Sequence, residues 1–304
     1  RLIEDLADRW SANPPTALRA GGIGVRDLRR TAKDLGLDEP AAAVLIETAA
    51  AAGLIGPSAA MPPVWLLTAG YDDWIERDAP QRWLELARAW LDMPRRPGLI
   101  GAPGARERTV AALSPDAGRT TMPALRRQVL EVLASAPAGA AVADRESVLA
   151  RLMWLAPRRD AERRDQADEA LREAALLGIT GAGGLSGFAR ALLDDDAPGA
   201  AQLLSDALPA AVAEFLVQPD LTVVVPGPPD PELGRTLRLI ADLESSGGAY
   251  VFRISEATLR RALDAGRSAE DLRGFLGDRS RTPIPQALSY LIDDAARRHG
   301  SLRA

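Results

Sequence analysis

The sequence contains no cysteine, a single histidine (His299) and a single lysine (Lys33) among its 304 residues. The absence of thiols excludes disulfides, cysteine-based zinc sites and thiol nucleophiles. Histidine is the usual general base near neutral pH, so one histidine near the C-terminus leaves little equipment for acid–base catalysis. We therefore expect no enzymatic activity, no cofactor, no metal site and no small-molecule substrate, and we assign no catalytic residue.

Long apolar runs are also missing. No segment approaches the roughly 18 consecutive uncharged apolar residues that a transmembrane helix requires. The first residues, "RLIEDLADRW", are amphipathic and charged, unlike a signal peptide. Hydrophobic residues make up 47% of the chain and charged residues 26%, which is ordinary for a soluble globular protein. We expect a cytoplasmic protein without a membrane partner. Because the chain begins at Arg1 rather than Met, we also expect it to be a piece of a longer protein.

Positive charge comes almost entirely from arginine, since the 37 basic residues include only one lysine. Together with abundant Ala, Gly and Pro, this bias suggests a GC-rich genome, so arginine alone is weak evidence of phosphate binding. The net charge of −5 argues against a strongly sequence-independent DNA-binding protein, because such proteins usually carry a basic surplus.

The first region, residues 1–104, contains two helical patterns over residues 25–34 and 38–52, with Asp38 as an N-cap. Two short apolar strand candidates, "LIG" and "PPVWLLTAG", follow them. Helix, turn, helix and hairpin is the order of a winged helix. However, the expected recognition helix, residues 39–52, has no Arg, Lys, Asn or Gln for base readout. Further helix is predicted over residues 71–93, where a stripe of tryptophan, leucine and alanine indicates core packing, and residues 94–109 are expected to form a linker or exposed loop.

The second region, residues 105–210, shows helical patterns over residues 122–135, 144–155 and 163–177. After the last of these comes "LLGITGAGGLSG", which resembles "AAGLIGPSAAMPP" of the first region. Both segments run from a helix end into a turn rich in Gly or Ala, so we interpret them as a degenerate repeat of one winged-helix-like plan. The Gly-rich loop at residues 180–187 lacks a following Lys, and it predicts a hairpin turn rather than a phosphate-binding loop.

Arginine clusters supply the candidate DNA contacts, on the helix predicted over residues 25–34 of the first region and on the third predicted helix of the second region. The seven candidates are Arg26, Arg29, Arg30, Arg163, Arg164, Gln166 and Arg172. Interleaved acids such as Asp165 and Asp168 reduce the positive field around the second group. The alternative is that the winged helices serve as protein-interaction modules.

The third region, residues 211–304, is predicted to mix strands with helices. Strand candidates are residues 214–217, 221–225 and 249–254, and helix candidates are residues 231–244, 256–265, 269–277 and 284–298. A strand, a loop with Gly and a helix can hold a phosphate, but three of the four residues at 226–229 are proline and lack the N–H that an anion needs. We therefore predict a rigid turn. The three aspartates at 194–196 are predicted to be solvated rather than to bind a cation. In all, the sequence predicts an α+β chain, predominantly helical, in which tandem winged-helix-like modules precede a small α/β domain.

Two stretches of the third region carry a family resemblance: "FLVQPDLTVVVPGP" (residues 215–228) and "LESSGGAYVFRISEATLRRALDAGRSAEDLRGFLGDRSRTPIPQALSYLIDDAARRHG" (residues 243–300). They resemble the N-terminal domain of the XPB/Ssl2 family of DNA helicases, as it occurs in actinobacterial helicase-associated proteins that lack a motor. The resemblance implies an accessory module that lies outside the ATPase core and contacts partner subunits. No Walker A motif and no DEAD-like box occur in this sequence.

The resemblance implies a non-catalytic role in DNA repair or transcription, through protein–protein contacts and DNA binding. The expected partners are an XPB-type DNA helicase or another repair or transcription protein, and DNA. The alternative function is that of a winged-helix DNA-binding transcriptional regulator.

Overall fold

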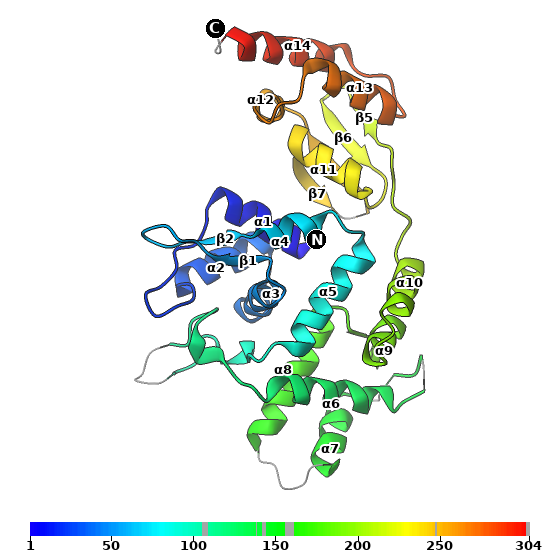
Figure 1. Cartoon of the computed structure of the whole chain (residues 1–304). Helices are drawn as coiled ribbons and strands as arrows, with labels where there is room; N and C mark the ends of the chain where they lie inside the picture. Colours follow the sequence, from blue (N-terminus) through cyan, green and yellow to red (C-terminus); the bar gives the residue numbers. More distant parts are fainter. Residues whose placement is uncertain (105–108, 138, 142–143, 156–160, 247, 302–304) are drawn as a thin grey trace. The chain divides into compact units, whose positions relative to one another are not determined.

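The computed structural model divides the chain into two compact units, Arg1–Ser205 (unit 1) and Asp206–Ala304 (unit 2). It describes residues 1–104, 109–137, 139–141, 144–155, 161–246 and 248–301. Helices predominate, and the strands form small antiparallel sheets (Figure 1). The predicted fold class, predominantly helical α+β with an α/β C-terminal region, is therefore confirmed. Within the described ranges, no helix is long and apolar enough to cross a membrane.

The N-terminal part of unit 1 has the element order that the sequence predicts. Its elements are α1 (Leu2–Ala12), α2 (Val25–Leu35), α3 (Glu39–Ala51), β1 (Ile55–Pro57) and β2 (Trp65–Leu67). The Asp38 carboxylate caps α3 by accepting a hydrogen bond from the Ala41 N–H at 2.8 Å. Strands β1 and β2 pair as an antiparallel hairpin, with Ile55 opposite Leu67. The helices and the hairpin are confirmed, whereas the name winged helix stays a prediction.

Two helices, α4 (Ala69–Ile75) and α5 (Ala79–Asp92), occupy the region where continuous helix was expected. The break occurs at Asp78, whose carboxylate accepts a hydrogen bond from the Gln81 N–H at 2.8 Å and so starts a new helix. The tryptophans have the core roles predicted for them. Trp74 is 2% exposed and Trp90 fully buried, and half-buried Trp83 donates its indole N–H to the Leu177 carbonyl.

The remainder of unit 1 contains further helices and a second short hairpin. Its elements are α6 (Met122–Ala134), α7 (Arg145–Leu155), α8 (Ala161–Leu176), β3 (Thr180–Gly181), β4 (Gly184–Leu185), α9 (Gly187–Leu193) and α10 (Ala197–Ala207), the last of which continues into unit 2. The three helices predicted here are confirmed, and so is the hairpin in the Gly-rich loop. Helices α9 and α10 were not among the predicted elements.

The repeated sequence corresponds to a repeated local structure at the ends of α3 and α8. Gly53 and Gly178 both have positive φ, 72° and 71°. The residue after each glycine is a buried aliphatic that donates its N–H back to the helix, Leu54 to Ala49 and Ile179 to Ala174, each at 2.9 Å. This is the Schellman arrangement of a helix C-terminus. In both places the chain then enters a two-stranded hairpin.

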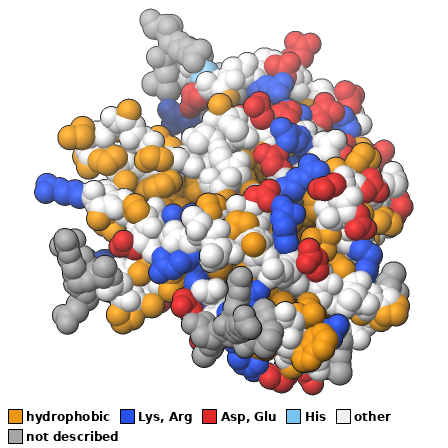
Figure 2. Space-filling model, turned by 60° about the horizontal axis from the view of Figure 1, so that its bottom comes forward, with side chains coloured by type: hydrophobic (Ala, Val, Ile, Leu, Met, Phe, Trp, Pro, Cys, Tyr) orange, Lys and Arg blue, Asp and Glu red, His pale blue; other side chains and the backbone are white. Residues whose placement is uncertain are grey.

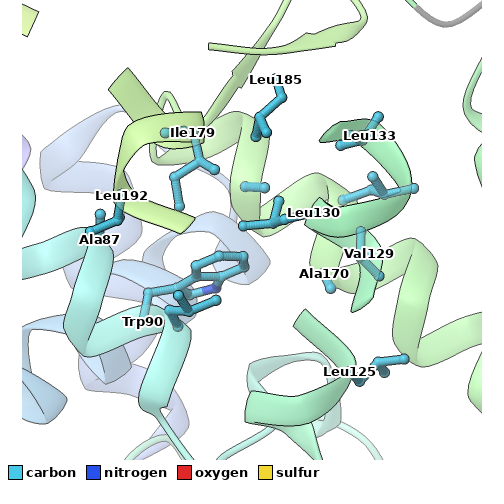
Figure 3. Close-up of a cluster of buried hydrophobic side chains, with 14 of the residues drawn as sticks. Ala87, Trp90, Leu125, Val129, Leu130, Leu133, Ala170, Ile179, Leu185 and Leu192 are labelled. Atoms are coloured by element: carbon cyan, nitrogen blue, oxygen red, sulfur yellow. The ribbon is translucent and has the colours of Figure 1, made fainter. Parts of the chain in front are cut away.

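A large hydrophobic cluster fills the space between α5, α6, α7 and α8. Its residues include Trp90, Leu130 and Ile179, and Figure 3 shows the Trp90 indole at its centre, with Leu130 and Ala170 close by. A second cluster joins α1, α2 and α3 through Trp10, Leu28 and other side chains. Both clusters belong to unit 1. The predicted division of residues 1–210 into two domains at residue 104 stays a prediction.

Residues 94–100 are not the exposed loop that their Pro, Gly and Arg content predicted. They include a short 3₁₀ helix (Pro97–Leu99), and Arg96 is only 7% exposed. Arg95 donates to Glu47 of α3, and Arg96 donates to Glu169 of α8. The two arginines therefore pair with glutamates on α3 and α8. These pairs are distant in the sequence, so the local composition of residues 94–100 does not predict them.

Unit 2 consists of one four-stranded sheet and helices packed against it. Its elements are β5 (Leu216–Val217), β6 (Thr222–Val225), α11 (Pro231–Ile240), β7 (Asp242–Ser246), β8 (Tyr250–Arg253), α12 (Glu256–Asp264), α13 (Ala269–Arg279) and α14 (Gln286–Ser301). The strand order is β5-β6-β8-β7, with every neighbouring pair antiparallel. Val217, Val223 and Phe252 lie side by side in the register, and they are buried in a core shared with the four helices.

One predicted helix of unit 2 was partly wrong, because its C-terminal end is a strand in the structure. Residues 231–244 were predicted to be helical throughout, but α11 ends at Ile240 and β7 starts at Asp242. Ala241 has extended backbone, with φ −150° and ψ 160°. Strand β7 pairs with β8 at the sheet edge, and this pairing outweighs the helical pattern of "ADLESS". The other predicted strands and helices of unit 2 are confirmed.

Candidate functional site

Helix α2 presents a row of basic side chains on its exposed face. Arg26 and Arg29 are exposed and Arg30 is half-buried, while Leu28, Thr31 and Ala32 are buried on the opposite side. Arg29 pairs with Glu39 and Arg30 with Asp27, both at 2.9 Å. The structure describes no polar contact for exposed Arg26. Two of the three predicted DNA contacts on α2 are thus already matched by carboxylates.

Lys33 extends this row, and the sequence reasoning missed it. It follows Arg26 by seven residues, so the two side chains share one face of α2. Lys33 is exposed, and the structure describes no ion pair for it. The signal was present in the sequence as the spacing 26, 30, 33. We call Arg26, Arg29, Arg30 and Lys33 the α2 stripe.

Helix α3 cannot serve as a recognition helix. Residues 42–49 are all buried, and eight consecutive residues cover every face of a helix. The absence of Arg, Lys, Asn and Gln from α3 has the same cause, because α3 is the central core helix of its part of unit 1. Any nucleic-acid contact by this part of the chain would have to come from other elements, such as the α2 stripe.

The four predicted DNA contacts on α8 have partners within the protein. Arg164 donates to Glu146 of α7 at 2.5 Å, Gln166 donates to Glu162 at 3.1 Å, and Arg172 pairs with Asp168 at 3.1 Å. The hydrogen bond to Glu146 raises the pKa of Arg164 above its ordinary value. Arg163 donates to Gln128 of α6.

The structure does not join the α8 residues to the α2 stripe in one surface. Helix α2 packs against α1 and α3, whereas α8 packs mainly against α6 and α7. Figure 2 shows Arg and Lys side chains interspersed with Asp and Glu on the face in view, rather than one large basic field. The arrangement therefore favours local contacts over a continuous basic track.

Three further arginines form ion pairs that join the helices of unit 1; Arg96 and Arg126 are buried and Arg95 is partly buried. Arg126 is fully buried and pairs with Glu173, which also accepts the Trp90 indole N–H at 2.7 Å. Burial lowers the pKa of Arg126 and raises that of Glu173, and the attraction between the two charges opposes both changes. Arg95 and Arg96 make the pairs with Glu47 and Glu169 described above. These residues hold the fold together and are not available to a ligand.

The loops at residues 226–229 and 194–196 have structural roles. Asp230, after the loop at residues 226–229, caps α11 through the Leu233 N–H at 2.7 Å, and the Pro228 carbonyl accepts from the Val212 N–H. Asp196 caps the start of α10 through the Gly199 N–H. In the described part of the chain, no group of three or more His, Asp or Glu side chains could hold a metal ion. His299 contacts the Asp264 carboxylate at 2.9 Å.

The surface of unit 2 is covered with ion pairs between neighbouring elements. Arg279 pairs with Glu232, and Arg298 pairs with Glu256, both at 2.7 Å. Among its described residues, three large hydrophobic side chains are nevertheless exposed: Tyr290 of α14 at 64%, Leu208 at 39% and Leu243 of the edge strand β7 at 37%.

One protein-family model matches the chain, and it covers less than half of it. The model is described as "Helicase conserved C-terminal domain", and it matches residues 215–304. A search of curated proteins finds no match. The matched residues lie entirely within unit 2 and include its sheet and all four of its helices from α11 to α14. The relationship to helicases expected for this region is therefore confirmed in its general form: residues 215–304 match a helicase conserved C-terminal domain.

Proposed function

We propose that the chain is a non-catalytic, helicase-associated module that acts in DNA repair or transcription through protein–protein contacts. The observation that carries this proposal is the coincidence of the helicase family match, residues 215–304, with the separately packed unit 2. The finer resemblance to the N-terminal domain of XPB-type helicases makes such a helicase the proposed partner. Unit 2 would supply the contact, with unit 1 tethered to it.

Binding of the whole chain to a purified XPB-type helicase from the same organism tests the proposal. Isothermal titration should give a saturable complex, and the chain alone should not hydrolyse ATP. Tyr290→Ala should weaken the complex about tenfold, because exposed aromatic side chains commonly dominate interface energies. The matched control is Gln286→Ala, which removes the Tyr290 hydrogen-bond partner one helical turn away on α14 but leaves the ring. ATP hydrolysis by the chain alone, or no complex at all, would contradict the proposal.

A second candidate function is a winged-helix DNA-binding regulator, and the α2 stripe favours it. Arg26 and Lys33 are exposed on one face of α2 with no described ion pair. Titration of duplex DNA at several salt concentrations separates the two candidates. A regulator should distinguish its site from other sequences by about 4–10 kcal/mol and lose affinity steeply as salt rises. An adaptor should bind duplex DNA weakly and without sequence preference.

A further inference from the structure

An exposed tryptophan on α7 distinguishes one surface of unit 1 from the rest. The side chain of Trp154 is 68% exposed, and that of the next residue, Leu155, is 54% exposed. The other tryptophans of the unit pack in its cores or are half-buried. Exposing an indole costs hydrophobic free energy, so a tryptophan on the outside of a folded helix is typical of a binding surface.

An arginine covers one face of this indole. The Arg151 guanidinium lies 4.5 Å from the centre of the Trp154 ring, one turn earlier on the same helix. Among the described residues, no carboxylate pairs with Arg151. Its charge is therefore free to interact with an anion, and its stacking holds the indole so that the other face of the ring is open to solvent.

A groove with a volume of about 330 Å³ lies beside this pair. Its walls come from α6, α7 and the first turn of α8: Gln128, Glu131, Val132, Ser135, Arg151, Leu152, Leu155 and Arg163. Five of these eight side chains are polar or charged. The lining includes the guanidiniums of Arg151 and Arg163 and the carboxylate of Glu131.

We propose that Trp154, Arg151 and the adjoining groove form a binding site for single-stranded nucleic acid. An unpaired base stacks on the open face of the Trp154 indole, and the Arg151 guanidinium attracts a backbone phosphate. The groove beside them offers polar side chains, among them Arg163 and Gln128, which bond to each other. An aromatic platform beside a cationic groove is the usual means of binding unpaired bases. Duplex DNA fits poorly, because its bases are stacked and their faces are closed. The site lies in unit 1, outside the residues of the helicase match, and so goes beyond the proposed function.

Fluorescence anisotropy with a labelled oligodeoxythymidine of about 12 nucleotides tests the site on the whole chain. Trp154→Ala should weaken binding about 5- to 150-fold, as expected for the loss of one stacked base, while Trp154→Phe should retain most of the affinity. Arg151→Ala should weaken binding and reduce the slope of log K against log salt by about 0.7 for each phosphate contact that is lost.

Matched controls come from the same unit. Leu203→Ala removes another exposed apolar side chain, from α10, and Arg145→Ala removes an arginine of α7 that already pairs with Asp168 at 2.8 Å. Both should change binding less than twofold. An unchanged thermal midpoint in Trp154→Ala would show that the fold is intact, as its exposure leads us to expect. Failure of the wild-type chain to bind the oligonucleotide, or equal binding by Trp154→Ala, overturns the proposal. Loss of helicase binding in Trp154→Ala without any oligonucleotide binding would instead identify a protein-docking surface, which also overturns it.

Discussion

Arg126 of α6 and Glu173 of α8 form an ion pair inside unit 1, with 3.1 Å between Nη2 and Oε2 and side-chain exposures of 0% and 3%. Arg126 also donates to the carbonyls of Trp90 and Arg95, at 3.0 and 2.9 Å. A single guanidinium therefore connects α6, α8, the end of α5 and the segment that follows α5. Buried charges of this kind are costly when one partner is removed, because the other then remains uncompensated.

We predict that Arg126→Met destabilises the chain by about 3–5 kcal/mol, because it leaves the Glu173 carboxylate buried without its partner. Urea unfolding followed by circular dichroism measures the change. Arg127→Met is the matched control, since Arg127 is the next residue of α6 and its pair with Asp92 is exposed, which predicts a loss of about 0–1 kcal/mol. The double substitution Arg126→Met/Glu173→Met should recover much of the loss. Equal effects of the two single substitutions would show that the buried pair has no special weight.

The two Schellman turns give a second prediction. Gly53→Ala and Gly178→Ala should each cost about 1–2 kcal/mol, because a Cβ atom is strained at their positive φ values of 72° and 71°. Steric crowding does not contribute, since a Cβ at Gly53 meets nothing within 4 Å and one at Gly178 meets only the Trp83 indole nitrogen at 3.9 Å. Gly187→Ala, at the start of α9, is the control and should be neutral or slightly stabilising. Similar losses at the two turns would support the equivalence of the two segments, and a neutral result at either turn would count against it.

Local signals in the sequence were sufficient for most elements of the fold. Asp38, Ser255 and Ser268 mark helix starts because each side chain bonds to a backbone N–H only three residues ahead. Long-range pairings were not predictable in the same way. The glutamates that pair with Arg95 and Arg96 lie 48 and 73 residues away in the chain. Residues 94–100 were therefore predicted to be a linker. The seven candidate DNA contacts were chosen as charged or hydrogen-bonding side chains on predicted helices, and partners such as Glu39 and Glu146 became visible only in the structure.

Acid should destabilise unit 2 partly through Asp271, a capping residue of α13. The Ser268 backbone N–H, with a further contribution from its hydroxyl, lowers the pKa of Asp271 below the usual aspartate value. A lowered folded-state pKa adds stability that is present above the unfolded-state value, about 3.9, and is lost as pH falls through the folded-state value. Asp271→Asn should therefore reduce the thermal midpoint at pH 7, and the difference from the wild type should shrink below about pH 4. A difference that stays constant from pH 7 to pH 3 would contradict this role of the charge.

Arg261 of α12 caps the C-terminus of α11, and it yields the last prediction. Its guanidinium donates to the carbonyls of Arg238, Leu239 and Ala241, at 3.0 to 3.1 Å. These are carbonyls at the C-terminus of α11, which have no partner within the helix, so Arg261 closes the helix and lets the chain enter β7. Arg261→Ala should cost about 1 kcal/mol in urea unfolding and speed hydrogen exchange of the β7 amides. Arg261→Lys should recover only part of the loss, because one ammonium group cannot replace the planar guanidinium fork across three carbonyls. Arg260→Ala is the control, since the structure describes no polar contact for this exposed neighbour. If Arg260→Ala lowers the free energy of unfolding as much as Arg261→Ala does, the effect comes from removing charge from α12 in general.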